Sequence, residues 1–79
     1  MTDHKPLPVA GYKPQSDETI ALVNLNKMLE EKCLRHLDQM REDATIDQRW
    51  LAIGRTHLEQ AFMAINRAVF KPNRAELLP

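Results

Sequence analysis

Cys33, His36 and His57 are side chains of types that commonly bind metals, and they fall in the part of this sequence that predicts helices. Cys33 and His36 stand three residues apart, which places them on one side of a helix, and zinc favours thiolate and imidazole ligands. A fourth ligand is missing, and the spacing matches no common zinc motif. A buried thiol beside a surface imidazole accounts for the same pattern. The sequence therefore predicts neither a metal site nor a cofactor.

Catalytic groups are equally sparse in this sequence. An enzyme site needs a nucleophile, a base and an orienting group within reach of one another. Ser16 is better explained as a helix cap, because Asp17 and Glu18 follow it as the acidic first turn of a helix. No glycine-rich phosphate loop is present, and no paired carboxylates stand out on one helical face. We expect a binding protein and not an enzyme.

Two cations interrupt apolar helical stripes. Lys27 breaks such a stripe, and Arg67 lies among Ile65, Ala68 and Val69. The planar fork of an arginine can hold a phosphate through two hydrogen bonds, whereas a lysine supplies a point charge. For each cation the alternative is a solvated charge whose stem packs on the helix.

Tyr12 follows Gly11 in a proline-rich N-terminal segment. A tyrosine ring in such an arm can stack on a nucleobase, which is worth ~1–3 kcal/mol per base. Packing of the ring on a helix is the alternative, and the residues alone favour neither.

Length and composition exclude several classes of protein. A chain of 79 residues forms one domain at most, and so small a core usually needs staples or partners. Its single cysteine, Cys33, rules out an internal disulfide and indicates a reducing cytosol. No signal peptide and no apolar run of about 20 residues is present, so we expect no membrane partner. Because 11 basic residues balance 11 acidic ones, we also expect no DNA or RNA polymer as partner.

Two long helices should position these residues. Residues 1–15 contain three prolines and predict an extended N-terminal arm. The first helix should begin after Ser16 and run to about Met40. The second should begin at a capping box made by Thr45 and Gln48, with Asp47 as the alternative cap, and should end at about Phe70.

So short a connection makes the two helices antiparallel. The sequence thus predicts an all-α fold, an antiparallel two-helix hairpin with an extended N-terminal arm. We divide the chain into the arm (1–15), a helical hairpin domain (16–72) that Pro72 closes, and a flexible tail (73–79).

The apolar residues exceed what one seam between two helices needs. On the first helix, steps of three and four residues place these on one stripe: Leu22, Leu25, Leu29, Cys33, Leu37 and Met40. Six apolar residues are then expected outside the seam: Ile20, Val23, Leu34, Phe62, Met63 and Val69. Gly54 within the second helix indicates close approach by another helix. Because a large exposed apolar patch usually marks an interface, we expect a helical homo-oligomer.

Three stretches of this sequence resemble one known family. They are DQRWLAIGRTHLEQAFMAINRAVFKP (Asp47–Pro72), GYKPQS in the arm and NLNK in the first helix. The resemblance is to the phage anti-CBASS sponges, whose hairpin domain is shared with phage anti-Thoeris sponges. It implies capture, without cleavage, of cyclic di- and trinucleotide immune signals such as cyclic GMP-AMP and cyclic tri-AMP. It also implies a homohexamer in the cytoplasm of the infected bacterial host.

The resemblance assigns roles to individual residues of the proposed dinucleotide pocket. Tyr12 is expected to stack on a base, and Lys27 to meet a phosphate. Gly11 and Lys13 flank the tyrosine and are expected in the same pocket.

A second pocket, for trinucleotides, is expected to contain Arg67 and Met28. Met28 stands where the family pattern leads us to expect a small polar residue, a departure that bears on trinucleotide affinity. Two alternatives use the same hairpin: a small protein–protein interaction module that binds a host protein, and a sponge for cyclic ADP-ribose isomers.

Overall fold

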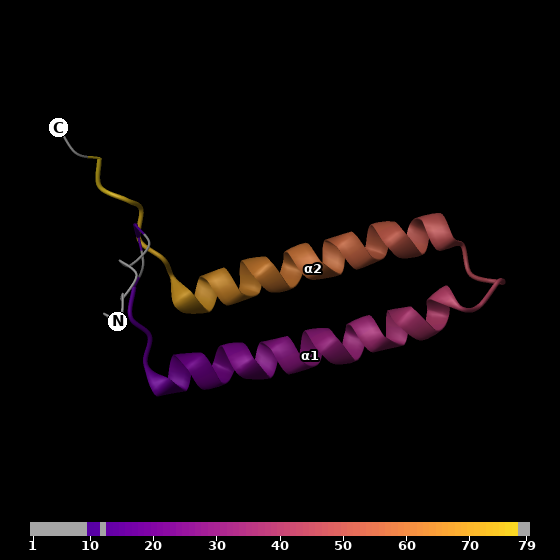
Figure 1. Cartoon of the computed structure of the whole chain (residues 1–79), viewed down its shortest axis with the longest axis horizontal. Coiled ribbons are helices and arrows are strands. Elements are labelled where there is room, and N and C mark those ends of the chain that lie inside the picture. Colours follow the sequence, from indigo (N-terminus) through magenta and orange to yellow (C-terminus); the bar gives the residue numbers. More distant parts are fainter. Residues whose placement is uncertain (1–9, 12, 78–79) are drawn as a thin grey trace, which may run out of the picture.

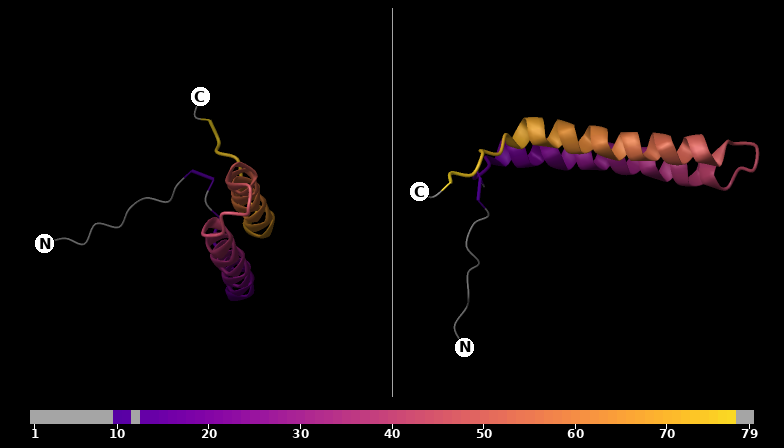
Figure 2. Two further views of the ribbon diagram at one scale, coloured as in Figure 1. Left: turned by 90° about the vertical axis from the view of Figure 1, so that its right-hand side faces the viewer. Right: turned by 90° about the horizontal axis from the view of Figure 1, so that it is seen from above.

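Two antiparallel helices form a hairpin in the computed structural model, which describes residues 10, 11 and 13–77. Helix α1 comprises Asp17–Arg41 and helix α2 comprises Gln48–Phe70. They run side by side over their whole length, joined by a short loop at one end, so that the start of α1 and the end of α2 lie at the other (Figures 1 and 2). The described residues contain no strand. The predicted all-α hairpin is confirmed.

Helix α1 begins where its cap was predicted. The hydroxyl oxygen of Ser16 accepts a hydrogen bond from the backbone N–H of Thr19 at 3.2 Å, which satisfies one of the donors left free in a first turn. Asp17 and Glu18 complement the positive end of the helix dipole. The helix ends at Arg41, one residue beyond the predicted Met40.

Helix α2 begins with the alternative cap. The Asp47 carboxylate accepts hydrogen bonds from the backbone N–H groups of Arg49 and Trp50, both at 3.1 Å. The predicted capping box at Thr45 is therefore wrong. Asp47 immediately precedes the first helical residue, whereas Thr45 lies three residues before it, too early to reach the free donors of the first turn.

Thr45 and Gln48, the residues of the predicted capping box, instead form hydrogen bonds within the interhelical loop. Thr45 donates to the Asp43 carboxylate from its hydroxyl, at 2.6 Å, and from its backbone N–H, at 2.9 Å. The side-chain bond, with help from the backbone bond, holds the pKa of Asp43 below its ordinary value. The Gln48 amide donates to the carbonyl oxygens of Met40, Asp43 and Ile46. The loop is thereby closed by its own side chains.

Helix α2 ends at Phe70, as predicted from Pro72. Lys71 takes a left-handed backbone conformation, with φ 47° and ψ 56°, and its N–H donates to the carbonyl oxygen of Arg67 at 2.8 Å. This is the usual way in which a helix satisfies a late carbonyl and turns the chain aside.

The seam between the helices contains apolar residues that were not expected there. Among the described residues only Val23 is fully buried, with 2% of its surface exposed. Leu34, Phe62 and Val69 are half-buried. These four were expected outside the seam, and that expectation is wrong; Ile20 and Met63 do remain exposed, as expected.

Part of the predicted stripe of α1 faces outward instead. Leu22, Leu25 and Leu29 are each about half exposed. Apolar spacing alone favoured the wrong stripe of α1, because the seam in the structure also contains polar residues. Asn26 donates from its side-chain amide to the side-chain oxygen of Asn66 at 3.1 Å, across the seam. A paired amide can occupy such a position because its hydrogen-bonding capacity is met there.

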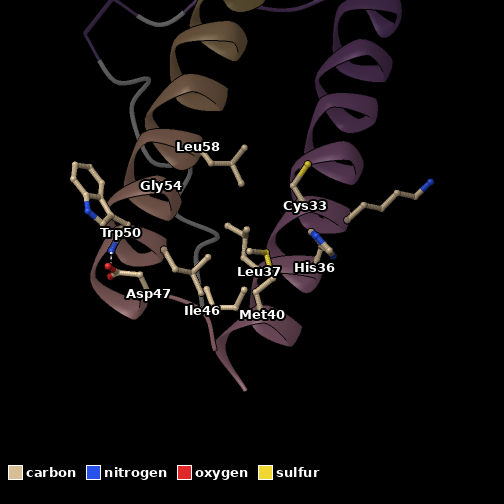
Figure 3. Close-up of a pocket in the computed structure, with 11 residues that line it drawn as sticks. Cys33, His36, Leu37, Met40, Ile46, Asp47, Trp50, Gly54 and Leu58 are labelled. Carbon is tan, nitrogen blue, oxygen red and sulfur yellow. Dashed lines mark hydrogen bonds between the residues drawn. The ribbon is translucent and has the colours of Figure 1, made fainter. Parts of the chain in front are cut away.

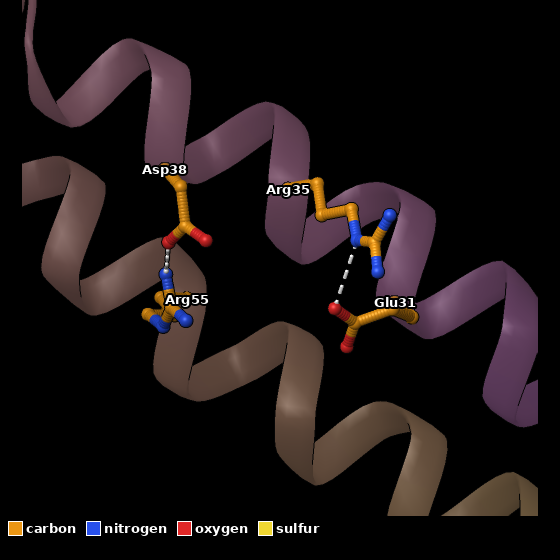
Figure 4. A network of polar contacts seen from close by, with 4 residues as sticks. All are labelled: Glu31, Arg35, Asp38 and Arg55. Carbon is orange, nitrogen blue, oxygen red and sulfur yellow. Dashed lines mark hydrogen bonds and ion pairs between the residues drawn. The ribbon is translucent and has the colours of Figure 1, made fainter.

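Two ion pairs lie outside the seam (Figure 4). Arg55 of α2 bonds Asp38 of α1 at 2.8 Å, and Arg35 bonds Glu31 within α1 at 3.1 Å. The hydrogen bond that Arg55 donates to the Asp38 carboxylate raises the pKa of Arg55. Both pairs are well exposed, so solvent screens them and they contribute little to stability. Neither described helix contains an apolar run long enough to cross a membrane.

Candidate functional site

A pocket of about 720 Å³ lies at the open end of the hairpin, where α1 begins and α2 ends. We call it the open-end pocket. Its walls come from the arm, the first turn of α1, the last two turns of α2 and the residue that follows Lys71. The lining residues are Lys13, Pro14, Gln15, Ile20, Met63, Asn66, Arg67, Phe70 and Pro72.

The open-end pocket combines positive charge with apolar surface. Lys13 and Arg67 both line it, and none of the described lining residues is acidic. Neither cation forms an ion pair with another described residue. Ile20, Met63 and Phe70 supply apolar surface beside them. This combination suits an anion that also carries a flat, weakly polar group.

The residues of α2 that line the pocket lie on one side of this helix because of helical periodicity. Met63, Asn66, Arg67 and Phe70 are spaced by three, one and three residues, so all four project from one side of the helix. The bond between Asn66 and Asn26 fixes this side of α2 against α1. Arg67 is therefore carried by a packed helical turn, although its own side chain is exposed.

The predicted site residues divide into two groups in the structure. Lys13 and Arg67, which the sequence assigned to different ligands, line the same pocket. Lys27 does not line it. Seven residues separate Lys27 from Ile20, however, so Lys27 lies on the same flank of α1, two turns or about 10 Å further along. Met28 does not line the pocket either, and its side chain is 60% exposed.

The two remaining predicted site residues belong to the arm. Gly11 is not among the residues that line the pocket, and its carbonyl oxygen accepts a hydrogen bond from the backbone N–H of Asn73, beyond the end of α2. Tyr12 lies outside the described residues. Sequence reasoning missed Gln15, Met63 and Phe70 as lining residues. The spacing of Met63 and Phe70 around Arg67 was a usable signal for two of them.

A second groove, also of about 720 Å³, lies at the loop end (Figure 3). Leu37, Met40 and Ile46 line it between the two helices, and Trp50 and Gly54 line it from α2. Trp50 is 65% exposed, and nothing lies within 4 Å of where a Cβ would stand on Gly54. The groove therefore has open space beside its small residue.

The groove continues along both helices as an apolar face. Steps of three, four and seven residues extend each wall along its own helix. We define the apolar face by Leu22, Leu25, Leu29, Cys33 and Met40 of α1 and by Trp50, Gly54, Ala61, Ile65 and Ala68 of α2.

The apolar face and the open-end pocket lie on opposite flanks of the hairpin. Residues two apart in a helix project about 200° apart. Ile20 of the pocket and Leu22 of the apolar face are two apart, and so are Met63 and Ile65. A partner could cover the apolar face without filling the pocket of the same chain.

The thiol and imidazoles do not form a metal site in the described part of the chain. No three His, Cys, Asp or Glu side chains gather there in a way that could hold a metal ion. Cys33 and His36 both line the loop-end groove (Figure 3). The expectation of a buried thiol is wrong, because Cys33 lies at the edge of the seam, on the exposed apolar face.

The fold and its pocket define a class: a helical hairpin that offers a cationic, partly apolar pocket on one flank and an uncovered apolar face on the other. The sequence matches a family model described as "Acb2/Tad1, hairpin domain" over residues 5–70. The chain belongs to this family, and that membership implies a phage anti-defence sponge role. No curated protein and no solved structure matches the chain.

Proposed function

We propose that this protein sequesters cyclic oligonucleotide immune signals without cleaving them and so keeps them from the effectors of bacterial CBASS defence. The open-end pocket carries the proposal. Its two cations, Lys13 and Arg67, stand beside apolar side chains with no acidic residue among the described lining. A cyclic nucleotide matches this arrangement because its phosphates are negative and its bases are flat and weakly polar.

The family resemblance adds two residues to the proposed dinucleotide site. Tyr12 would stack on a base, and Lys27 would meet a phosphate from its place two turns beyond Ile20. A cyclic dinucleotide repeats its phosphate and base twice, so two chains related by a two-fold axis would offer two matching sets of these residues. Lys13 would then serve the same ligand from the arm.

Assembly of several copies completes the proposal. The apolar face leaves Leu22, Leu25, Leu29, Trp50 and Ile65 at least 44% exposed, which is unfavourable for an isolated chain in water. A second copy would cover it, and the open space at Gly54 suits a closely packed helix. The family resemblance makes a hexamer the expected state and the host cytoplasm the expected location. In such an assembly several Arg67 side chains could meet the phosphates of a cyclic trinucleotide.

A calorimetric titration with 3′,3′-cyclic GMP-AMP and with cyclic tri-AMP tests the function. We expect saturable binding and recovery of intact ligand after the protein is denatured. Recovery of a linear nucleotide would show a nuclease and refute sequestration. The panel should also include a cyclic ADP-ribose isomer, the ligand of the related sponges.

Matched variants test the proposed roles of Arg67 and Lys27 in ligand binding. Arg67→Gln and Lys27→Gln remove a cation while keeping a polar side chain of similar shape. A lost charge-assisted hydrogen bond costs about 1.5–3 kcal/mol, so binding of the affected ligand should weaken roughly tenfold or more. Arg35→Gln is the control, because Arg35 is well exposed on α1 and pairs only with Glu31 among the described residues. Equal affinity of all three variants and the wild type would refute the assignment.

The apolar face favours a second candidate, a module that binds a host protein through this surface. It would bind none of the nucleotides in the panel. If the wild-type protein bound none of the nucleotides in the titration, this result would therefore favour the interaction module over the sponge.

A further inference from the structure

Two hydrogen bonds tie the N-terminal arm to the chain that leaves α2. The backbone N–H of Asn73 donates to the carbonyl oxygen of Gly11 at 3.1 Å. The side-chain amide of Gln15 donates to the carbonyl oxygen of Phe70 at 3.0 Å and to that of Lys13 at 2.8 Å. The arm is thus held at two points four residues apart, and Lys13 lies between them.

The first tie point admits only glycine without distortion. Gly11 has φ +82°, in the left-handed region that side chains disfavour. A Cβ placed on it would also collide with the carbonyl oxygen of Asn73. The backbones of the arm and of the C-terminal segment therefore approach each other more closely than any other residue at position 11 would allow.

The second tie point satisfies a helix end. The last carbonyls of an α-helix have no partner within the helix, and that of Phe70 is one of them. Gln15 supplies the missing donor from the arm, and it is itself half-buried. Left-handed Lys71 turns the chain aside at this point and leads it through Pro72 to Asn73. The end of α2 and the arm consequently form one connected unit.

We propose that Gln15 and the backbone of Asn73 are positioning groups that latch the arm at the open-end pocket, holding Lys13 at the pocket that it lines together with Arg67. The latch rests on the proposed function, since its purpose is to retain the bound cyclic nucleotide. Through Asn73, the latch gives the segment that follows α2 a role in holding the arm. Without the latch, the arm must be ordered each time a ligand binds, so the ligand should leave faster.

Two substitutions at one position isolate the first tie point. Asn73→Pro removes the backbone donor, whereas Asn73→Ala keeps it and removes only the side chain. We measure dissociation of 3′,3′-cyclic GMP-AMP by stopped flow. Losing one hydrogen bond should raise the dissociation rate roughly fivefold in Asn73→Pro, while Asn73→Ala should behave as the wild type. Equal dissociation rates in the two variants would overturn the latch, and binding by the wild type would still support the sponge.

Gln15→Met tests the second tie point, because methionine keeps the length of the side chain and lacks the donor. It should raise the dissociation rate by a similar factor, in addition to any change that the lost helix-end hydrogen bond makes to the thermal midpoint. A lower midpoint with an unchanged dissociation rate would overturn its positioning role.

Amide hydrogen exchange examines the latch without any ligand. The Asn73 amide of the wild type should exchange more slowly than an unstructured amide, and Gly11→Ala should remove this protection. An unprotected Asn73 amide in the wild type would overturn the latch. A protected amide in a protein that binds no nucleotide would support the contact itself and refute both the sponge and the retention of its ligand.

Discussion

Replacing Leu29 with lysine tests whether the apolar face is an assembly surface. Leu29 stands near the middle of the α1 part of this face and is 45% exposed in the single chain. The substitution places a charge where a second copy would otherwise bury the leucine. It should separate the subunits, because a charged side chain is costly to bury without a partner.

The size of the effect follows from the exposed fraction. Full burial of a leucine side chain is worth about 2 kcal/mol. With 45% of Leu29 still exposed, about 1 kcal/mol remains to be gained by each copy on assembly. A two-fold interface buries Leu29 of both copies, so losing both leucines reduces the free energy of association by about 2 kcal/mol. This corresponds to a roughly 30-fold increase in the dissociation constant. The buried charge adds to this loss.

Sedimentation velocity over a range of protein concentrations measures the change, with circular dichroism on the same samples. We expect a lower average mass for Leu29→Lys and a loss of helix at low concentration, because the isolated hairpin has little core of its own. Leu77→Lys is the matched control. Leu77 is 95% exposed and lies outside the apolar face, so the same substitution there should leave the mass unchanged.

Two results would refute this reasoning. A wild-type protein that sediments as a monomer at all concentrations would show that the apolar face needs no second copy. An oligomer that persists unchanged in Leu29→Lys would show that assembly uses another surface. The first result would also count against nucleotide sites shared between copies, whereas the second would leave the open-end pocket unaffected, since that pocket lies on the opposite flank.

Three further predictions concern the hairpin itself. Asn26→Ala should lower the free energy of unfolding by about 1–2 kcal/mol in urea titrations, and a double-mutant cycle with Asn66→Ala should reveal coupling, because each amide leaves the other unpaired. Asp47→Ala should cost about 1 kcal/mol in the same assay through loss of the α2 cap, and an unchanged midpoint would contradict that role. The Asp43 pKa is lowered in the folded state, so its contribution to stability is present above the ordinary pKa and is lost as pH falls through the folded one. Thr45→Val should raise this pKa, measured by carboxyl NMR, and flatten the acid limb of stability against pH; an unmoved pKa would refute the stated cause.

Local signals in the sequence were sufficient for the helices. Ser16 with its acidic neighbours marks the start of α1, and Pro72 marks the end of α2. Both depend on residues adjacent in the chain, so the sequence reveals them directly. The cap of α2 was harder, because Thr45 and Asp47 are both good caps two residues apart. Only the position of the first helical turn decides between them.

The choice of seam could not be read from apolar spacing. Two stripes of α1 compete for α2, and the leucine stripe is the more apolar one. The structure instead packs the stripe of Val23 and Leu34, because it also matches Asn26 with Asn66 across the seam. Such a match depends on residues 40 positions apart and has no signal in either helix alone.

The sequence by itself determined the two helices and the surplus of apolar residues, since each of these follows from local spacing and composition. Only the tertiary structure decided which stripe faces outward and which cations share a pocket. Lys13 and Arg67 meet at one pocket because the hairpin brings the end of α2 back beside the residues that precede α1. That meeting depends on the antiparallel packing of α1 and α2 and on the contact between Gly11 and Asn73, which join residues far apart in the chain.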